Sequence, residues 1–445
     1  MVLSHQDMIT LFRNSAPYIN AHRGKTFVLM ISGEAIESPT LPTIIHDIAL
    51  LNTLGVRVVI VHGARPQIDE RIELRNIKGR FHGDVRITDK TTLECVKDAA
   101  GSVRSQVEAL LTMGLANSPM HGAQIRVASG NLVVAKPMGV RDGVDFENTG
   151  FVRRIDIQGI NDHLNDGSIV LLSPIGYSPT GEVFNLSHEE VATRAAEALG
   201  ANKLIAFSEF KGIMEKVTGD TGVELILHRN IELARFEMLI DQGNLVNEPS
   251  VINALHNSVE QGIPRAHCVS YDIDGALIKE LFTRDGTGSL VMENHYEQLR
   301  PADINDVGGI LSLIKPLEES GALVKRSRER LENEIDQFTV IERDGMIIAC
   351  AALYAYPQDQ LGEIACVATH AEYRGHSRGE RVLEALRSQA IEQGLHTLFV
   401  LTTLTAHWFL EQGFVPGDIS DLPQQKQELY NFTRKSKVFK LAVER

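Results

Sequence analysis

A run of arginines and glycines in the C-terminal part of the chain offers the clearest chemistry in this sequence. It lies between an apolar run at 364–368, which predicts a buried strand, and a helical pattern at 382–391. Glycines let a backbone approach a ligand closely, and unpaired N–H groups at a helix start attract anions. Two arginines can add charge-assisted bonds to phosphate oxygens. The pattern therefore predicts a phosphate-binding loop made of Arg374, Gly375, His376, Ser377, Arg378 and Gly379.

By itself such a loop can also be an ordinary solvated loop, so the elements around it matter. It resembles the pyrophosphate-binding motif of the GNAT acetyltransferases, Arg/Gln-x-x-Gly-x-Gly, with Ser377 in place of the usual middle glycine. That serine requires either a negative φ or a tolerated strain. A strand pattern at 395–403 and an aromatic helix at 407–414 that ends in Gly-Phe match the next elements of the family. The resemblance implies acetyl-CoA as the cosubstrate.

Acetyl transfer to an amine needs a base, because an amine attacks a thioester only after it has lost its proton. Glu363, just before the predicted strand, is the candidate; a solvated carboxylate at a strand edge is the alternative. The GNAT counterpart lies at the acetyl end of the cofactor, which favours a base that acts through water. Main-chain N–H groups near Cys366 and Val367 are expected to hold the thioester oxygen. A buried cysteine is more often an inert apolar residue, so we expect direct transfer, with Cys366 at most protonating the leaving thiolate.

The composition limits the class of protein. At 445 residues two or three domains are expected. A net charge of −14 argues against a nucleic-acid or anionic-membrane partner, and no apolar run is long enough to cross a membrane. The four cysteines show neither the spacing of a zinc site nor a disulfide framework, so we expect no metal. The N-terminus lacks the pattern of a signal peptide, and a reduced cytoplasmic location fits.

Upstream of the loop, strand and helix patterns alternate from residue 26 to residue 207. Such alternation predicts a parallel sheet with helices on both faces. Segments 28–34, 58–66, 184–189 and 267–288 resemble the amino-acid kinase fold. The kinases use a lysine where this chain has Met30, and a glycine triplet where it has Gly63, Ala64 and Arg65. Since phosphoryl transfer depends on positioned positive charge, and no second lysine motif appears at 230–250, the sequence predicts a dead kinase site.

Segment 267–288 closely resembles the corresponding part of arginine-sensitive acetylglutamate kinases. The resemblance implies an allosteric L-arginine site, in which Glu280 and Asp285 accept from the guanidinium; a capped helix and a plain loop are the alternative. Residues 1–24 predict a helix that is broken by Pro17 and packs either on its own domain or on a neighbouring one. The implied site is Tyr18, His267, Glu280, Gly286 and Gly288.

Together these features predict an N-terminal helix at 1–24, a kinase-like regulatory domain at 25–291, a linker at 292–298 and a GNAT domain at 299–445. The fold class is α/β, an amino-acid-kinase-like parallel-sheet sandwich followed by a GNAT α+β domain. This order resembles the bacterial N-acetylglutamate synthases, which implies L-glutamate as acceptor in the first step of arginine biosynthesis, feedback inhibition by L-arginine, and homo-oligomers, namely hexamers. Acetylation of another amine, or arginine sensing with weak enzyme activity, remain alternatives.

A dicarboxylate substrate needs at least two cations. The tail from Lys426 to Arg445 has six Lys or Arg against two acidic residues in a chain of net charge −14. A basic tail is usually just solvated, but an acidic substrate is a specific reason for one. The family resemblance implies Arg326, Lys426, Arg434 and Ser436 as the glutamate ligands.

Overall fold

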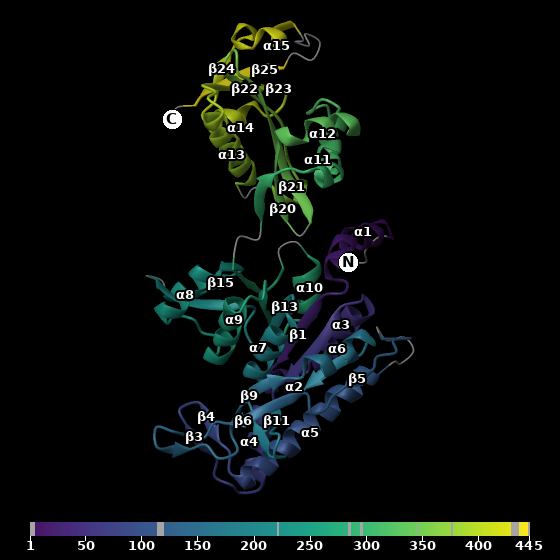
Figure 1. Ribbon diagram of the computed structural model, residues 1–445, viewed down its shortest axis with the longest axis vertical. Helices are drawn as coiled ribbons and strands as arrows, with labels where there is room; N and C mark the ends of the chain where they lie inside the picture. The colour runs from purple at the N-terminus through teal and green to yellow at the C-terminus, as the bar shows by residue number, and fades with distance from the viewer. Residues whose placement is uncertain are drawn as a thin grey trace. The chain divides into compact units, whose positions relative to one another are not determined.

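The computed structural model describes residues 5–113, 120–219, 222–283, 286–293, 297–343, 345–374, 377–428 and 436–443. The chain divides into two compact units, Met1–Asn294 and His295–Arg445. Figure 1 shows that each unit has its own large sheet with helices packed against it. Each unit therefore has its own hydrophobic core.

The first unit is built on an eight-stranded sheet in the order β16-β18-β17-β13-β1-β2-β10-β5. Its centre is parallel: β1 (Thr26–Ile31) pairs with β2 (Arg57–His62) on one side and β13 (Lys203–Ser208) on the other. All six residues of β1 are buried, as in parallel strands that are covered on both faces. The other strands are β5 (Val127–Ala128), β10 (Ile169–Leu172), β16 (Asn230–Glu232), β17 (Ala266–Ser270) and β18 (Ser289–Met292).

Helices cover both faces of this sheet because successive side chains of each strand point to opposite faces. Phe27, Leu29 and Ile31 pack against one group of helices, and Val28 and Met30 against the other. The first group is α2 (Gly33–Glu37), α3 (Leu41–Thr53), α4 (Arg65–Leu74), α5 (Lys90–Thr112) and α10 (Ala276–Phe282). The second group is α6 (Ile157–Asn165), α7 (His188–Leu199), α8 (Leu233–Gln242) and α9 (Pro249–Glu260).

Shorter strands extend this unit. One set forms a four-stranded sheet of β12 (Val183–Asn185), β11 (Ile175–Tyr177), β6 (Val133–Pro137) and β9 (Gly150–Ile155). The others form hairpins, β3 (Arg80–His82) with β4 (Val85–Ile87), β7 (Val140–Arg141) with β8 (Val144–Asp145), and β14 (Ile213–Gly219) with β15 (Gly222–His228). Residues 131–145 contain β6 and the hairpin of β7 and β8.

Helix α1 (His5–His22) differs from its prediction, because Pro17 lies inside the helix and does not break it. A proline removes one backbone donor, and the helix tolerates that loss here. The C-terminal end of α1 packs on its own unit: His22 Nε2 lies 2.9 Å from the carbonyl oxygen of Leu281, and its ring contacts Phe27 and Phe282 edge-on. Phe12, nearer the start, is 74% exposed.

The second unit is a seven-stranded sheet in the order β19-β20-β21-β22-β23-β25-β24. Helix α11 (Val307–Glu319) lies on one face and α13 (Arg378–Glu392) on the other (Figure 1). The strands are β19 (Gln298–Pro301), β20 (Phe338–Arg343), β21 (Met346–Tyr356), β22 (Leu361–Thr369), β23 (Thr397–Thr402), β24 (Val415–Gly417) and β25 (Lys437–Ala442). The remaining helices are α12 (Arg328–Glu334), α14 (Ala406–Glu411) and α15 (Gln424–Glu428).

Among the residues that the structure describes, no helix has the length and apolar character needed to cross a membrane. Nor do three or more His, Cys, Asp or Glu side chains in these residues gather in a way that can hold a metal ion.

Candidate active site and candidate effector site

The centre of the second unit is the point where two neighbouring strands stop pairing. Strands β22 and β23 pair in parallel over four positions, from Leu361 opposite Thr397 to Ile364 opposite Val400. Beyond Ile364, β22 pairs only with β21 among the described strands. The ladder with β21 is bulged there, and Cys366 has a φ of +55°, which is uncommon for a residue with a side chain. Cys366 and Val367 therefore lie on a strand edge that β23 leaves open.

Glu363 lies inside β22 as its third residue, because the strand begins at Leu361, whereas the sequence analysis placed Glu363 just before the strand. It is 6% exposed, and its Oε2 lies 2.6 Å from Nζ of Lys426. The Tyr356 hydroxyl donates to the same oxygen over 3.4 Å. Burial and the adjacent Glu363 raise the pKa of Tyr356 well above its usual value, so this hydroxyl keeps its proton. The structure thus brings together the predicted base and one predicted substrate ligand, as an ion pair.

Arg326 lies on the same side of the sheet, before α12. Its main-chain N–H donates to Glu318 Oε1 over 2.8 Å, and Nη1 donates weakly to the Val324 carbonyl. Its Nε is buried and has no hydrogen-bond partner among the described residues. Burial acts against the guanidinium charge, but Cys366, Tyr354 and Glu334 outweigh it and raise the Arg326 pKa. A buried donor without a partner is costly, which suits a side chain that binds a ligand carboxylate.

Cys366 is 3% exposed and is a free thiol, like the other three cysteines. Contact with Cys350 and the charge of Arg326 lower the Cys366 pKa, although burial acts in the opposite direction. Cys350 donates to the Cys366 carbonyl at 3.6 Å. A thiol with a lowered pKa beside the open strand edge is placed to exchange a proton there, while its burial disfavours attack on an external thioester.

The predicted phosphate loop leads into α13. Ser377 is the N-cap of this helix, with a φ of +51° and no capping bond from its side chain. Of the two conformations that the sequence allowed at this serine, the structure has the strained one. Gly379 is a glycine because a Cβ there would lie 3.1 Å from the Trp408 ring. Arg374 is exposed; Gly375 and His376 lie outside the described residues.

The side chain of Arg378, predicted from the sequence to bind phosphate, is held by other residues of the protein. Its Nε and Nη2 donate to Glu297 Oε1 over 2.8 and 2.6 Å, and Nη1 donates to the Tyr373 carbonyl over 2.8 Å. What remains for an anion is its main-chain N–H at the start of α13.

Glu297 is a site residue that the sequence analysis missed. It lies in the stretch predicted as a linker, yet its side chain is only 11% exposed and also pairs with Arg381 at 2.9 Å. Arg343 and Arg378 both stack on the Tyr373 ring. This cluster fixes the start of α13, and no local pattern around Glu297 could have indicated it.

Of the two remaining predicted glutamate ligands, Ser436 and Arg434, only the first lies among the described residues. Ser436 is half-buried and immediately precedes β25. Arg434 lies outside the described residues.

In the first unit, the predicted effector residues His267 and Glu280 form one buried cluster. His267 Nδ1 lies 2.8 Å from Glu280 Oε1, and its Nε2 lies 3.2 Å from Lys203 Nζ. Glu280 Oε2 accepts from the N–H groups of Thr287 and Gly288, each over 2.8 Å.

The two shifts in pKa have different causes. Burial and the nearby Lys203 lower the His267 pKa to about 4, so this ring is neutral at pH 7. Burial acts against the Glu280 charge, but His267 and the two loop N–H groups lower the Glu280 pKa to about 2.

Glycine is required at position 286 because a Cβ there would lie 2.3 Å from Glu280 Oε2. Its carbonyl accepts weakly from Arg229 Nη1. Tyr18 is half-buried on α1, and Asp285 lies outside the described residues. The structure therefore joins His267, Glu280 and the glycine loop, and supplies Lys203 as a neighbour that the sequence analysis did not name.

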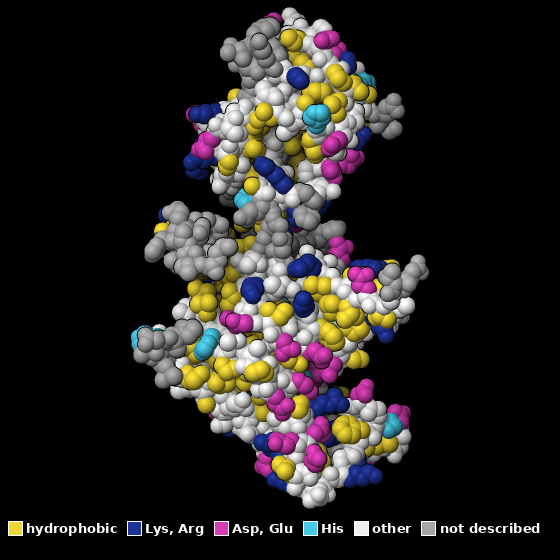
Figure 2. Space-filling model, turned by 180° about the vertical axis from the view of Figure 1, so that it is seen from behind, with side chains coloured by type: hydrophobic (Ala, Val, Ile, Leu, Met, Phe, Trp, Pro, Cys, Tyr) yellow, Lys and Arg dark blue, Asp and Glu magenta, His cyan; other side chains and the backbone are white. Residues whose placement is uncertain are grey.

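A pocket in the first unit is lined by more carboxylates than cations. It has a volume of about 460 Å³ and lies beyond the carboxyl ends of β1 and β2, where Glu34, Asp84, Glu189, Glu190 and Glu248 outnumber Arg65 and Arg86. Acidic side chains also gather on the face of this unit seen in Figure 2. Met30 is 1% exposed within the core below.

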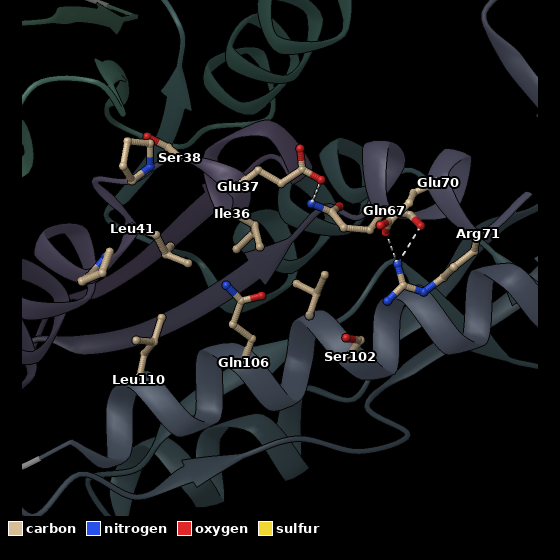
Figure 3. A pocket seen from close by; sticks show the side chains of 13 residues that line it. Ile36, Glu37, Ser38, Leu41, Gln67, Glu70, Arg71, Ser102, Gln106 and Leu110 are labelled. Carbon is tan, nitrogen blue, oxygen red and sulfur yellow. Dashed lines mark hydrogen bonds and ion pairs between the residues drawn. The ribbon is translucent and has the colours of Figure 1, made fainter. Parts of the chain in front are cut away.

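A second pocket, of about 510 Å³, lies between α2, α3, α4 and α5. Figure 3 shows Gln67 at its edge, where Nε2 donates to Glu37 Oε1 over 2.9 Å and to the Gly33 carbonyl over 2.8 Å. Arg71 donates back to the Gln67 carbonyl and to Glu70. Gln67 thus fixes the turn after β1 that borders the acidic pocket.

Two known protein families match separate parts of the chain. Residues 25–263 match the Amino acid kinase family, and residues 309–414 match the Acetyltransferase (GNAT) family. Among solved structures, the N-acetylglutamate synthase of Neisseria gonorrhoeae in complex with coenzyme A and L-arginine has 32% identity and a TM-score of 0.86, over 98% of this chain and 99% of that one. Its complex with coenzyme A and N-acetyl-glutamate has 33% identity and a TM-score of 0.59 over the same shares.

Curated relatives that match the chain over nearly its whole length are amino-acid acetyltransferases. Those of Pseudomonas fluorescens and Azotobacter vinelandii are 51% and 50% identical, over 98% of this chain and the whole of each relative. The two-part fold predicted from the sequence, kinase-like and then GNAT, is thereby confirmed. The chain belongs to the family of amino-acid acetyltransferases.

Proposed function

We propose that this protein transfers the acetyl group of acetyl-CoA to the amino group of L-glutamate. The observation that carries the proposal is the 2.6 Å ion pair between the buried carboxylate Glu363 and Lys426 on β22. A second cation, the largely buried Arg326, acts on Cys366 three residues further along, where β23 leaves the strand edge open. A dicarboxylate amino acid needs cations for its acid groups and a base for its ammonium. The relative from Neisseria gonorrhoeae, bound to coenzyme A and N-acetyl-glutamate, supports the same pair of substrates.

In the proposed mechanism Glu363 removes a proton from the substrate ammonium through a water molecule. The free amine then attacks the thioester carbonyl, a C–N bond forms, and main-chain N–H groups near Cys366 and Val367 hold the developing oxyanion. As the tetrahedral intermediate collapses, the C–S bond breaks and the nitrogen loses its second proton. The CoA thiolate takes up one proton, which Cys366 at most relays from that nitrogen through water, so that the Cys366 thiol is restored. Lys426 exchanges its contact with Glu363 for one with a substrate carboxylate, which frees the base as the substrate binds.

The phosphate loop is proposed to hold the pyrophosphate of acetyl-CoA through main-chain N–H groups at the start of α13. Arg374 adds an exposed cation that can pair with the pyrophosphate. Gly379 has no side chain, so the pyrophosphate can approach the backbone closely. Arg378 contributes its main-chain N–H, while its side chain holds the loop against Glu297.

The test is a steady-state assay of CoA release with L-glutamate, L-glutamine, L-aspartate and a lysine-containing peptide as acceptors. Glutamine lacks one carboxylate, so its kcat/KM should be roughly 10- to 150-fold lower, the value of one charge-assisted bond. Mass spectrometry should identify N-acetyl-L-glutamate. A lysine peptide that is acetylated faster than glutamate, or the absence of any acceptor, would overturn the proposal.

We also propose that L-arginine binds the cluster of His267 and Glu280 and lowers the acetyltransferase rate as feedback on arginine biosynthesis. A carboxylate has about four acceptor sites, and Glu280 uses three of them for His267, Thr287 and Gly288. One site remains for a guanidinium. The relative from Neisseria gonorrhoeae that was solved with L-arginine supports this effector.

Glu280→Ala should abolish arginine inhibition and leave the uninhibited rate near that of the wild type. The wild-type coupling should be about 1–3 kcal/mol, reciprocal between arginine and substrate in binding. The exposed neighbour Lys279→Ala is the control and should remain arginine-sensitive. Arginine that competes with glutamate in the Glu280→Ala protein would contradict the allosteric proposal.

Finally, we propose a cytoplasmic homo-oligomer, with hexamers as the expected state from the family resemblance. Ile9 and Phe12, three residues apart on α1, are 45% and 74% exposed, and an apolar pair on one face of a helix supports a contact with another copy. Light scattering on Phe12→Ser should then give a smaller mass than wild-type protein. A monomeric wild type would contradict this proposal.

A further inference from the structure

Glu297 is a carboxylate beside a site that is proposed to bind phosphates. Strand β19 begins at the next residue and pairs with β20, so the sheet fixes where Glu297 lies. Its Oε1 accepts from Arg378 Nη2 over 2.6 Å, and its Oε2 accepts from Arg381 Nη1 over 2.9 Å. Arg343 Nη1, at the end of β20, lies 3.8 Å from Oε1. One carboxylate therefore joins three guanidinium groups.

Arg378 carries this contact to both sides of the phosphate loop. Its Nε and Nη2 donate to Glu297, and its Nη1 donates to the Tyr373 carbonyl over 2.8 Å. Tyr373 precedes the loop and Arg378 begins α13, so this last bond joins the two sides of the loop. The Tyr373 ring is 3% exposed, and the guanidinium groups of Arg343 and Arg378 each lie 5.3 Å from its centroid. The start of α13 is thus held by contacts within the protein.

A carboxylate in this place has two opposite effects on a phosphate. Its charge repels the phosphate and cancels one of the three positive charges nearby. Its hydrogen bonds hold the start of α13 in one position, so the N–H groups there bind an anion without first losing conformational freedom. Because two guanidinium groups lie 2.6 and 2.9 Å from the Glu297 oxygens, they compensate most of the repulsion. The positioning effect should therefore be the larger of the two.

We propose that Glu297 is a positioning residue for acetyl-CoA, which strengthens the binding of the pyrophosphate although its own charge opposes that binding. It acts through Arg378 and the Tyr373 carbonyl, which fix the helix start that faces the pyrophosphate. The inference rests on the proposed function and concerns the nucleotide end of the cosubstrate. It gives a residue of the predicted linker a part in binding acetyl-CoA.

The variant Glu297→Gln decides between the two effects by the sign of the change. Titration of the full-length protein with CoA should give a Kd about 10-fold higher than that of the wild type, the loss expected for one hydrogen bond to a charged group. The KM for acetyl-CoA should rise by a similar factor, while the glutamate KM and kcat stay within about twofold. If Glu297 is only a counter-ion, the freed arginines will bind CoA more tightly, most of all at low salt, and the inference is overturned.

The substrate S-acetylpantetheine separates the phosphate loop from the rest of the site. It has the thioester and the pantetheine arm of acetyl-CoA, and it lacks the pyrophosphate. With this substrate the kcat/KM of Glu297→Gln should stay within about twofold of the wild-type value, because the lost interaction is one that the substrate does not make. An equal loss with S-acetylpantetheine and with acetyl-CoA would mean general damage to the unit, and would overturn the positioning role.

Two further variants test the contacts of Glu297. Arg378→Lys keeps the charge and the main-chain N–H, but a lysine cannot reproduce the planar fork of donors, so the Kd for CoA should rise as in Glu297→Gln. Glu342→Gln is the matched control, because it removes an ion pair of the same two strands, with Arg300 at 2.6 Å. It should leave the Kd unchanged. A wild-type Kd in Arg378→Lys, or equal effects of the two glutamine variants, would overturn the inference.

The titration with CoA separates this inference from the choice of acceptor. If wild-type protein binds CoA but does not acetylate glutamate, the proposed acceptor is wrong, and the Kd of Glu297→Gln still supports or overturns the inference. If wild-type protein binds no CoA, the proposed function and this inference both fail.

Discussion

The two units each place a glycine-bearing turn and a helix start after a parallel strand, and they surround it with opposite charges. In the first unit the turns after β1 and β2 border a pocket lined by Glu34, Glu189 and Glu248. In the second unit the loop after β22 carries Arg374, and Arg326 and Lys426 lie near the same strand. Both backbones offer N–H groups to an anion. The side chains around them decide whether an anion is bound.

The carboxylates that line the pocket of the first unit also shift the pKa of one of their own number, Glu248. Burial raises the Glu248 pKa, and the neighbouring Glu34 and Glu189 raise it further. Adding phosphates would deepen this repulsion, whereas a substrate dicarboxylate in the second unit meets cations. The comparison therefore predicts that the first unit keeps a kinase-like backbone without supporting phosphate chemistry.

The largest effect is expected from Glu363→Gln, which removes the base and keeps the shape of the side chain. The kcat should fall roughly 10²- to 10⁴-fold, the usual value of a positioned base. Stopped-flow measurement of CoA release checks this, with acetyl-CoA affinity as the control because the amide still fills the site. A variant that keeps more than about a tenth of the wild-type rate, below the range for such a base, would show that Glu363 only pairs with Lys426.

Arg326→Ala should have the next largest effect, on glutamate binding. It removes a charge-assisted bond to a substrate carboxylate, worth roughly 1.5–3 kcal/mol, so the glutamate KM should rise about 10- to 150-fold. The KM for acetyl-CoA should change far less, and its measurement under saturating glutamate is the check. Loss of acetyl-CoA affinity with normal glutamate affinity would place Arg326 at the cofactor instead, and would weaken the contrast between the two units.

The sequence predicted the elements of both units well because each has a local signal. Buried strands such as β1 and β22 are apolar and β-branched, and the phosphate loop lies between a strand and a helix pattern. Glu363, Cys366 and Lys426 carried no signal of their own and were identified through the family resemblance. The structure adds their geometry, with Glu363 and Lys426 only 2.6 Å apart.

Contacts between distant parts of the chain could not be predicted. Glu297 reaches Arg378 across 81 residues, and nothing near Glu297 in the sequence distinguishes it from a solvated linker residue. The same holds for Glu334 and Tyr354, 20 residues apart. Arg378 was assigned to phosphate because the loop motif says which residues are present, and says nothing of which partner each side chain takes.

A smaller effect is expected from Ser377→Gly, which tests the strain in the phosphate loop. A serine at a φ of +51° costs about 1 kcal/mol more than glycine, part of which is offset by the greater freedom of glycine in the unfolded chain. The net gain in unfolding free energy should be about 0.5 kcal/mol, or about 2 °C in melting temperature for this unit. Differential scanning calorimetry of the full-length protein, with CoA added to identify the transition of the second unit, measures it.

Ser388→Gly in the same helix is the matched control, because Ser388 is exposed and lies in the interior of α13. Glycine in a helix interior should lower the same melting temperature. If Ser377→Gly also lowers the melting temperature, the positive φ at Ser377 carries no strain.

For the last prediction we expect no effect at all. ATP with Mg²⁺ should neither bind the first unit nor be consumed. Met30 is buried where the kinases carry a lysine, and it cannot neutralise a transferring phosphate. The carboxylates of the acidic pocket repel the nucleotide further, so Met30→Lys alone should not restore activity. Calorimetric titration of ATP and a phosphate-release assay with N-acetyl-L-glutamate give the measurement. Phosphorylated product above a blank without enzyme would break the comparison, because the first unit would then keep the chemistry that its charges argue against.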